Sequence, residues 1–187
     1  MLPFDQINTD WTLFLDRDGV INEEKHNEYI HTWDEFRFYE GVPQAIADLG
    51  RCFKYVVVIT NQKGVGKGVT KLEDLHLIHK NLKEAIIHAG GRIDGIYYCP
   101  DIDEESPNRK PNPGMGLQAV KDLPEIDLSH TIMVGNTLSD MQFGRNLGAY
   151  TVFLPTTRKE VDITDPRIDA VCSDLVEFAR IVCAGKL

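Results

Sequence analysis

Acidic, hydroxyl and basic side chains stand where short apolar segments of the sequence end. They follow four successive segments, and they are Asp16 and Asp18, then Thr60, then Lys110 and finally Asp140. A carboxylate can attack phosphorus to form an aspartyl-phosphate, and a second acid can protonate the leaving group. A lysine, a hydroxyl and a divalent cation can bind the phosphoryl oxygens. These residue types predict phosphoryl-transfer chemistry with Mg²⁺, which binds carboxylates, water and phosphate oxygens.

Each of these residues also has an ordinary structural explanation. Asp18 precedes a glycine, a pair that is common in turns, and Thr60 can begin a turn or a helix. Asp140 can stabilise the first turn of a helix, and Lys110 can be a solvated loop residue. All of these residues, however, follow the ends of successive apolar segments. This shared position favours one common site over a separate structural explanation for each residue.

The apolar segments alternate with amphipathic stretches along the chain. Continuous hydrophobicity in Val56–Ile59 indicates a strand that is buried on both faces. We expect strands at Thr12–Asp16, Tyr55–Thr60, Gly95–Tyr98, Thr131–Gly135 and Tyr150–Leu154. We expect helices at Val42–Phe53, Lys71–Ala89, Pro113–Leu123, Ser139–Leu147 and Leu175–Val182. This alternation predicts an α/β fold with a central parallel sheet, in which ligands bind beyond the carboxyl ends of the strands.

Composition limits the class of protein and its partners. The chain has 187 residues and a formal net charge of −9, and we expect a single domain across residues 1–187. The acidic excess argues against nucleic-acid and anionic-membrane partners, because both need a dense basic face. The first residues carry no basic and apolar secretory signal, and the four cysteines are scattered, with Cys52 and Cys183 expected to be buried. We therefore expect a cytoplasmic protein with reduced thiols.

The ordered set of residues resembles the four motifs of the haloacid dehalogenase (HAD) superfamily. The matching features are Asp16-x-Asp18-Gly19, the hydroxyl of Thr60, Lys110, and the segment Gly135–Asp140. The longer strings Phe14–Asn22, Thr60–Gln62 and Arg109–Met115 are similar to a subgroup of histidinol-phosphate and D-glycero-D-manno-heptose 1,7-bisphosphate phosphatases. The resemblance runs from about Thr12 to Leu154 and implies a Rossmann-like three-layer sandwich with a minimal cap.

The resemblance implies a role for each motif residue. Asp16 would be the nucleophile, Asp18 the general acid and base, Thr60 a ligand of the phosphoryl oxygens, and Lys110 the neutralising cation. The Mg²⁺ would be held by Asp16, the backbone carbonyl of Asp18, and the fourth-motif residues Asn136 and Asp140.

The resemblance also implies which residues face the substrate. They would be Asn61, Gln62, Lys67 and Arg109. The segment Asn22–Tyr39 would form a mobile flap, at about residues 20–40, that excludes water from the site.

Two features depart from the family pattern. Asn136 stands where the family usually has aspartate, so one negative charge is missing beside the metal, although an amide oxygen can still bind Mg²⁺. The loop Pro100–Asn108 contains neither cysteine nor histidine, so Cys99 alone remains of the zinc knuckle that this subgroup often carries. Four zinc ligands cannot be assembled there, and we predict no structural zinc.

The substrate implied by the resemblance is a small phosphorylated metabolite. A heptose 1,7-bisphosphate is favoured, with histidinol phosphate or another sugar phosphate as the alternative. A hypothesis of a different class is a phosphate-binding regulatory protein that lost turnover through Asn136. A receiver domain fits less well, because the lysine precedes the last acid-bearing strand end.

Two other patterns carry less chemistry. Gly64–Gly68 lacks the spacing of a nucleotide-binding loop, and we interpret it as a flexible loop that enters a helix. His76 and His79 are expected on an exposed edge of that helix.

Overall fold

A parallel sheet of six strands forms the centre of the protein, of which the computed structural model describes residues 2–184. The strands lie in the order β3-β2-β1-β4-β5-β6. They are β1 (Thr12–Leu15), β2 (Tyr55–Asn61), β3 (Gly95–Cys99), β4 (Thr131–Gly135), β5 (Tyr150–Phe153) and β6 (Ala170–Val171). The expected strands are confirmed to within one residue at their ends, and β6 adds a short edge strand.

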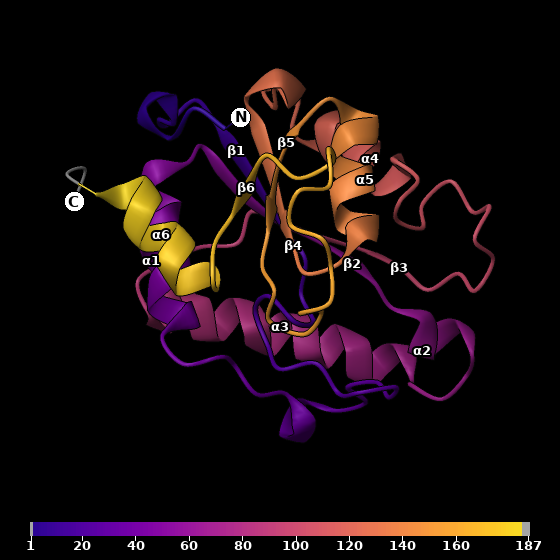
Figure 1. Cartoon of the computed structure of the whole chain (residues 1–187). Helices are drawn as coiled ribbons and strands as arrows, with labels where there is room; N and C mark the ends of the chain where they lie inside the picture. The colour runs from indigo at the N-terminus through magenta and orange to yellow at the C-terminus, as the bar shows by residue number, and fades with distance from the viewer. Residues whose placement is uncertain (1, 185–187) are drawn as a thin grey trace.

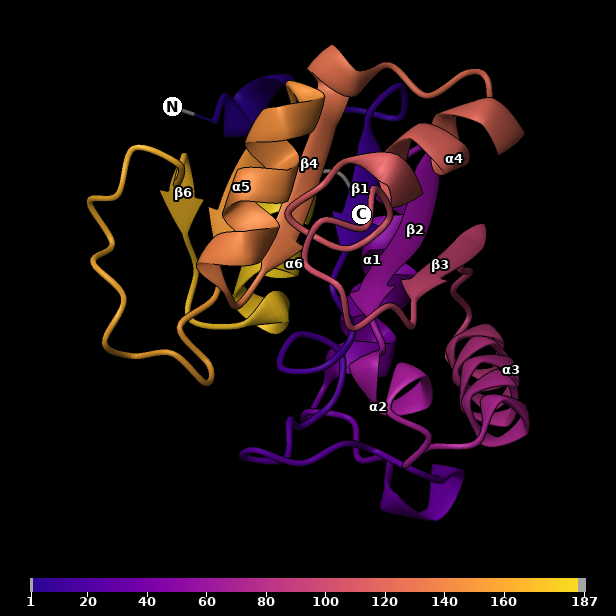
Figure 2. The ribbon, with the colours of Figure 1, turned by 90° about the vertical axis from the view of Figure 1, so that its right-hand side faces the viewer.

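Helices cover both faces of the sheet, which gives the expected three-layer α/β sandwich (Figure 1). One face packs against α1 (Val42–Cys52), α3 (Leu72–His88) and α6 (Leu175–Cys183). The other face packs against α4 (Gly114–Asp122) and α5 (Leu138–Leu147), which both lie on the near side of the sheet in Figure 2. Val56 and Val58 point into the first core and Val57 and Ile59 into the second, which explains why this strand has no polar face.

The order of the strands determines where the site forms. From β1 the chain builds β2 and β3 on one side, and it then crosses to β4, β5 and β6 on the other side. The carboxyl ends of β1 and β4 therefore meet where the direction of winding reverses, which is where open α/β sheets bind ligands.

The segments that leave these strand ends are held by specific contacts. The segment Asn22–Tyr39, which we expected to form a flap, is joined near its two ends by an antiparallel bridge between Asn22 and Phe38 and contains a 3₁₀ turn at Trp33–Glu35. Further 3₁₀ turns occur at Phe4–Gln6 and Leu128–His130. The glycine-rich segment after β2 is not the flexible loop we expected, because Lys63–Gly66 forms one helical turn, α2.

The four cysteines belong to the two hydrophobic cores on either side of the sheet. Within residues 2–184, no helix has the length and apolar character needed to cross a membrane. All four cysteines are buried, as expected for Cys52 and Cys183.

The core between the sheet and α4 and α5 depends on Phe143, which is 0% exposed. We predict that Phe143→Ala lowers the free energy of unfolding by about 3–5 kcal/mol, because it removes buried apolar area and leaves a cavity. Leu117→Ala, on the exposed side of α4 at 53% exposure, should change it by less than about 0.5 kcal/mol. Urea unfolding of both variants measures this, and equal effects would contradict the assigned core.

Candidate active site

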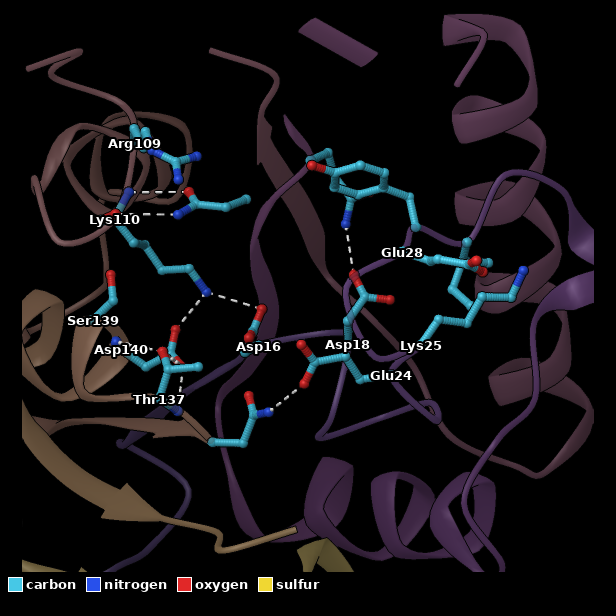
Figure 3. Close-up of a pocket in the computed structure, with 15 residues that line it drawn as sticks. Asp16, Asp18, Glu24, Lys25, Glu28, Arg109, Lys110, Thr137, Ser139 and Asp140 are labelled. Atoms are coloured by element: carbon cyan, nitrogen blue, oxygen red, sulfur yellow. Dashed lines mark hydrogen bonds and ion pairs between the residues drawn. The ribbon is translucent and has the colours of Figure 1, made fainter. Parts of the chain in front are cut away.

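A cavity of about 300 Å³ opens beyond the carboxyl ends of the strands (Figure 3). Its walls come from the segment after β1, the end of β2, the loop before α4, the start of α5 and the flap. The lining residues that carry chemistry include Asp16, Asp18, Glu24, Lys25, Asn61, Gln62, Arg109, Lys110, Asn136, Thr137, Ser139 and Asp140. The structure thus brings most of the predicted site residues into one cavity.

The ammonium group of Lys110 connects three parts of this site. Its Nζ lies 2.9 Å from Asp16 Oδ1 and 2.7 Å from Asp140 Oδ1, and it donates to the carbonyl oxygen of Ile59 at 2.8 Å. Burial favours the neutral amine, but the adjacent carboxylates of Asp140 and Asp16 outweigh it and raise the pKa of Lys110. Lys110 is therefore a fixed, buried positive charge.

Asp16 has one occupied carboxylate oxygen and one open one. Its Oδ1 accepts from Lys110 and, at 2.7 Å, from the backbone N–H of Arg17. No described residue donates to Oδ2. Burial raises the pKa of Asp16 to about 7. Lys110 works to lower this pKa and the charge of Asp140 works to raise it, so one lysine shared between two buried carboxylates does not offset the effect of burial.

Asp18 accepts hydrogen bonds on both oxygens. Oδ1 receives Arg17 Nη2 and Asn22 Nδ2, each at 2.9 Å, and Oδ2 receives Gln62 Nε2 at 2.9 Å. Burial works to raise the pKa of Asp18, but Arg17 and these hydrogen bonds overcome it and lower the pKa. Without bound substrate, Asp18 is therefore ionised at neutral pH.

Arg17 and His79 form a buried support behind Asp18. Arg17 is 0% exposed, and its Nη1 lies 3.3 Å from His79 Nε2 on α3. Burial, followed by the positive charge of Arg17, lowers the pKa of His79 to about 3. The expectation that His79 lies on an exposed helix edge is wrong, because the neutral imidazole accepts from a guanidinium inside the protein.

The residues at the end of β2 are placed by their own hydrogen bonds. Asn61 accepts from the backbone N–H of Lys110 at 3.0 Å and donates to its carbonyl oxygen at 3.1 Å, which fixes the loop that carries Lys110. Thr60 is buried behind the cavity wall, and its hydroxyl accepts from Gln62 at 2.9 Å. The contact of Thr60 with a phosphoryl group stays a prediction.

The two predicted substrate-binding cations lie at different depths. Arg109 lines the cavity, and its Nη1 donates to the carbonyl oxygen of Asp101 at 3.3 Å. Lys67 is exposed and lies outside the wall, with its Nζ 5.4 Å from the centre of the Tyr29 ring. Tyr29 lines the cavity, so Lys67 reaches its rim only through that ring.

The two fourth-motif residues are held differently. Both oxygens of Asp140 are engaged, Oδ1 by Lys110 and Oδ2 by the backbone N–H and hydroxyl of Thr137 in the capping box of α5. Asn136 is 1% exposed, and its Nδ2 donates to Glu24 Oε2 at 3.2 Å and Thr157 Oγ1 at 2.6 Å. The Oδ1 of Asn136 is buried without a hydrogen-bond partner among the described residues.

These oxygen atoms fit a hard divalent cation. Across residues 2–184, no three His, Cys, Asp or Glu side chains group closely enough to hold a metal by themselves. A cation at this site would therefore combine the open carboxylate oxygen Asp16 Oδ2 with neutral oxygens, namely the partnerless Asn136 Oδ1 and the Asp18 carbonyl that the resemblance implies. One carboxylate, an amide oxygen, a carbonyl and water are a donor set that Mg²⁺ accepts.

Several lining residues were not singled out by the sequence. Thr137 is the N-cap of α5, and the pattern Thr-x-x-Asp at 137–140 is a capping-box signal that marks it. Glu24, Lys25 and Glu28 belong to the expected flap, but nothing in their local sequence shows which of them turns toward the cavity.

Comparisons with known proteins place the chain in a family. A family model described as HAD-hydrolase-like matches residues 107–178. The D-glycero-alpha-D-manno-heptose-1,7-bisphosphate 7-phosphatase of Mycobacterium bovis is 37% identical over 140 residues, which cover 74% of this chain and 74% of that protein. The D-glycero-beta-D-manno-heptose-1,7-bisphosphate 7-phosphatase of Vibrio cholerae is 37% identical over 157 residues, covering 80% and 83%.

Solved structures agree in fold and in the named activity. A D,D-heptose 1.7-bisphosphate phosphatase from B. bronchiseptica, complexed with magnesium and phosphate, matches with a TM-score of 0.81 and 30% identity over 91% of this chain and 96% of that chain. The fold and the motif residues thus confirm the expected resemblance. The chain belongs to the HAD hydrolase superfamily, in the subgroup of the heptose-1,7-bisphosphate phosphatases.

Proposed function

We propose that this protein is a Mg²⁺-dependent phosphatase that hydrolyses D-glycero-D-manno-heptose 1,7-bisphosphate through an aspartyl-phosphate on Asp16. The observation that carries the proposal is the buried Lys110 ammonium. It holds Asp16 at the carboxyl end of β1, where one oxygen of the carboxylate is open to the cavity. The matched relatives, over about three quarters of the chain, carry the name of this activity.

The first step transfers the phosphoryl group to the protein. The Asp16 carboxylate attacks phosphorus, the bond from phosphorus to the substrate oxygen breaks, and Asp18 gives a proton to that oxygen. Asp18 is ionised without substrate, so it must first take a proton, and a bound phosphoryl anion favours this by raising its pKa through repulsion. For Asp18 to protonate the leaving group, its Oδ2 has to exchange the hydrogen bond from Gln62 Nε2 for one to the leaving oxygen.

The second step returns the protein to its starting state. Water attacks the phosphorus of the aspartyl-phosphate, Asp18 takes the proton of that water, and the bond from phosphorus to Asp16 breaks. Phosphate leaves, the Asp16 carboxylate is restored, and Asp18 releases its proton to water once the phosphoryl anion has left. Lys110 offsets negative charge in both the formation and the hydrolysis of the aspartyl-phosphate, because its ammonium remains protonated beside Asp16 throughout.

The bound metal would lower the repulsion between the Asp16 carboxylate and the phosphate. Asp16, the Asp18 carbonyl and Asn136 would hold it. Asp140 would act at one remove, by positioning Lys110 and closing the first turn of α5.

The cavity supports a small, doubly anionic substrate. Its volume of about 300 Å³ lies at the lower end of the range of small-molecule sites. Arg109 lines it and Lys67 stands at its rim, and Lys25 lines it in an ion pair with Glu35 at 3.0 Å, so Arg109 and Lys67 are the positive charges away from Lys110 that can meet a second phosphate. Asn61 and Gln62 line the cavity and Thr60 lies behind its wall, and we expect these three residues to bind the transferred phosphoryl group.

A regulatory, phosphate-binding protein is the second candidate, because Asn136 provides no negative charge at the metal. It predicts binding without turnover, whereas the phosphatase releases phosphate.

Phosphate release tests the proposal directly. We predict Mg²⁺-dependent release from the heptose 1,7-bisphosphate, offered as both anomers because the relatives bear both names, in preference to histidinol phosphate and other sugar phosphates. Asp16→Asn should lower kcat/KM by about 10⁴-fold or more, because it removes the nucleophile. Asp10→Asn, an exposed carboxylate before β1, is the matched control and should leave it unchanged. Turnover that appears only after Asn136→Asp would instead support the regulatory protein.

The pKa of Asp16 predicts how stability depends on pH. Folding raises the pKa of Asp16 to about 7, whereas in the unfolded chain this carboxyl has its ordinary pKa near 3.8. The contribution of the Asp16 proton to the free energy of unfolding is therefore fully present below the unfolded pKa, and it is lost as pH rises toward 7. Asp16→Asn carries a neutral side chain at every pH. With metal removed by chelator, its free energy of unfolding relative to that of the unaltered protein should therefore increase between pH 3.8 and about pH 7. Urea unfolding across the interval measures it, and a constant difference would contradict the raised pKa.

The absence of a structural zinc stays a prediction. Cys99 is buried at the end of β3, and the loop that follows it supplies no cysteine or histidine. We expect metal analysis of protein purified without chelator to find no stoichiometric zinc. One equivalent of zinc would show that this expectation is wrong.

A further inference from the structure

The buried amide of Asn136 is oriented by residues far from it in sequence. Its Nδ2 donates both hydrogens, one to Glu24 Oε2 on the flap and one to Thr157 Oγ1 after β5. A carboxylate can only accept hydrogen bonds, so Glu24 fixes which end of the amide is the nitrogen. The oxygen end of Asn136 is consequently turned away from Glu24 and left without a partner among the described residues.

Glu24 is itself held in place. Its Oε1 accepts from Arg158 Nη2 at 2.9 Å. The segment after β5 that carries Arg158 is also tied to the loop after β1, because the Thr156 hydroxyl donates to the carbonyl oxygen of Gly19. Gly19 has a φ of +83°, and a Cβ there would lie 2.0 Å from Asn136 Nδ2, so the close approach of these segments requires glycine. Figure 3 shows Glu24 beside Asp18, on the side of the cavity that faces Asp16.

The partnerless oxygen indicates what this arrangement is for. Leaving a buried amide oxygen unsatisfied is costly, and a cation or its water shell at this position would remove that cost. Asparagine offers such a cation a dipole but no charge, and it can also face it with the wrong end. An adjacent carboxylate on Nδ2 corrects the second fault, because it fixes the orientation of the amide.

We propose that Glu24 is a positioning residue of the metal site, which turns Asn136 Oδ1 toward the Mg²⁺. This inference rests on the proposed function only in taking Mg²⁺ as the ion. The competing explanation is that Glu24 merely ties the flap to the loop after β5 through Arg158.

A double-mutant cycle separates these explanations by calorimetric titration of the full-length protein with Mg²⁺ alone. Glu24→Gln has one oxygen, for which Arg158 competes, so its N–H₂ end faces Asn136 and the amide turns over. We expect the Kd for Mg²⁺ to rise about ten-fold or more, as is typical when an outer partner of a metal ligand is lost. In an Asn136→Asp background the same change removes repulsion between two carboxylates, and Mg²⁺ affinity should stay equal or increase.

Arg158→Gln is the matched control, because it breaks the ion pair while Glu24 still accepts from Asn136. It should not weaken Mg²⁺ binding, and urea unfolding of the metal-free variants checks that each one folds. Equal weakening by Glu24→Gln in both backgrounds, or weakening by Arg158→Gln to the same degree, would overturn the inference.

The outcomes also distinguish this inference from the proposed function. No Mg²⁺ binding by the unaltered protein would overturn both. The expected cycle in a protein that releases no phosphate would support the role of Glu24 and overturn the phosphatase.

Discussion

One shared buried cation holds the site together. The Lys110 ammonium contacts Asp16 after β1, Asp140 in α5 and the Ile59 carbonyl in β2, so three elements meet at one atom. Burying these charges is costly, and only close geometry with every proton of the ammonium engaged offsets that cost. Asn61 holds the backbone of Lys110 from both sides, and the capping box holds Asp140. The open Asp16 oxygen depends on all of these contacts.

The local charges explain how a protein of net charge −9 can handle a phosphate. Asp18 is balanced by Arg17, and Glu24 by Arg158, whereas Asp16 and Asp140 share a single lysine. The centre therefore has one negative charge more than it can neutralise, which the raised pKa of Asp16 expresses. A divalent cation reverses this sign locally and lets a small phosphate approach, while the acidic surface elsewhere disfavours extended polyanions.

The sequence predicted those features that depend on local pattern. The continuous apolar residues Val56–Ile59 predict a strand that is buried on both faces. Because parallel strands bring their carboxyl ends to one edge of the sheet, Asp16 and Lys110 were expected to meet there. Contacts that depend on packing between distant segments could not be predicted in this way. His79 meets Arg17 across 62 positions and Glu24 meets Asn136 across 112. A histidine on a helix, or an acid in a flap, carries no local signal of such a partner.

The most direct test of the account is to identify the residue that becomes phosphorylated. Acid quenching during turnover of the heptose bisphosphate with Mg²⁺, followed by mass spectrometry of the peptides, traps the covalent intermediate. The account predicts one phosphoryl group on Asp16, the carboxylate with an open oxygen beside Lys110. A phosphoryl group on any other residue during turnover would contradict it, as would steady phosphate release with Asp16→Asn.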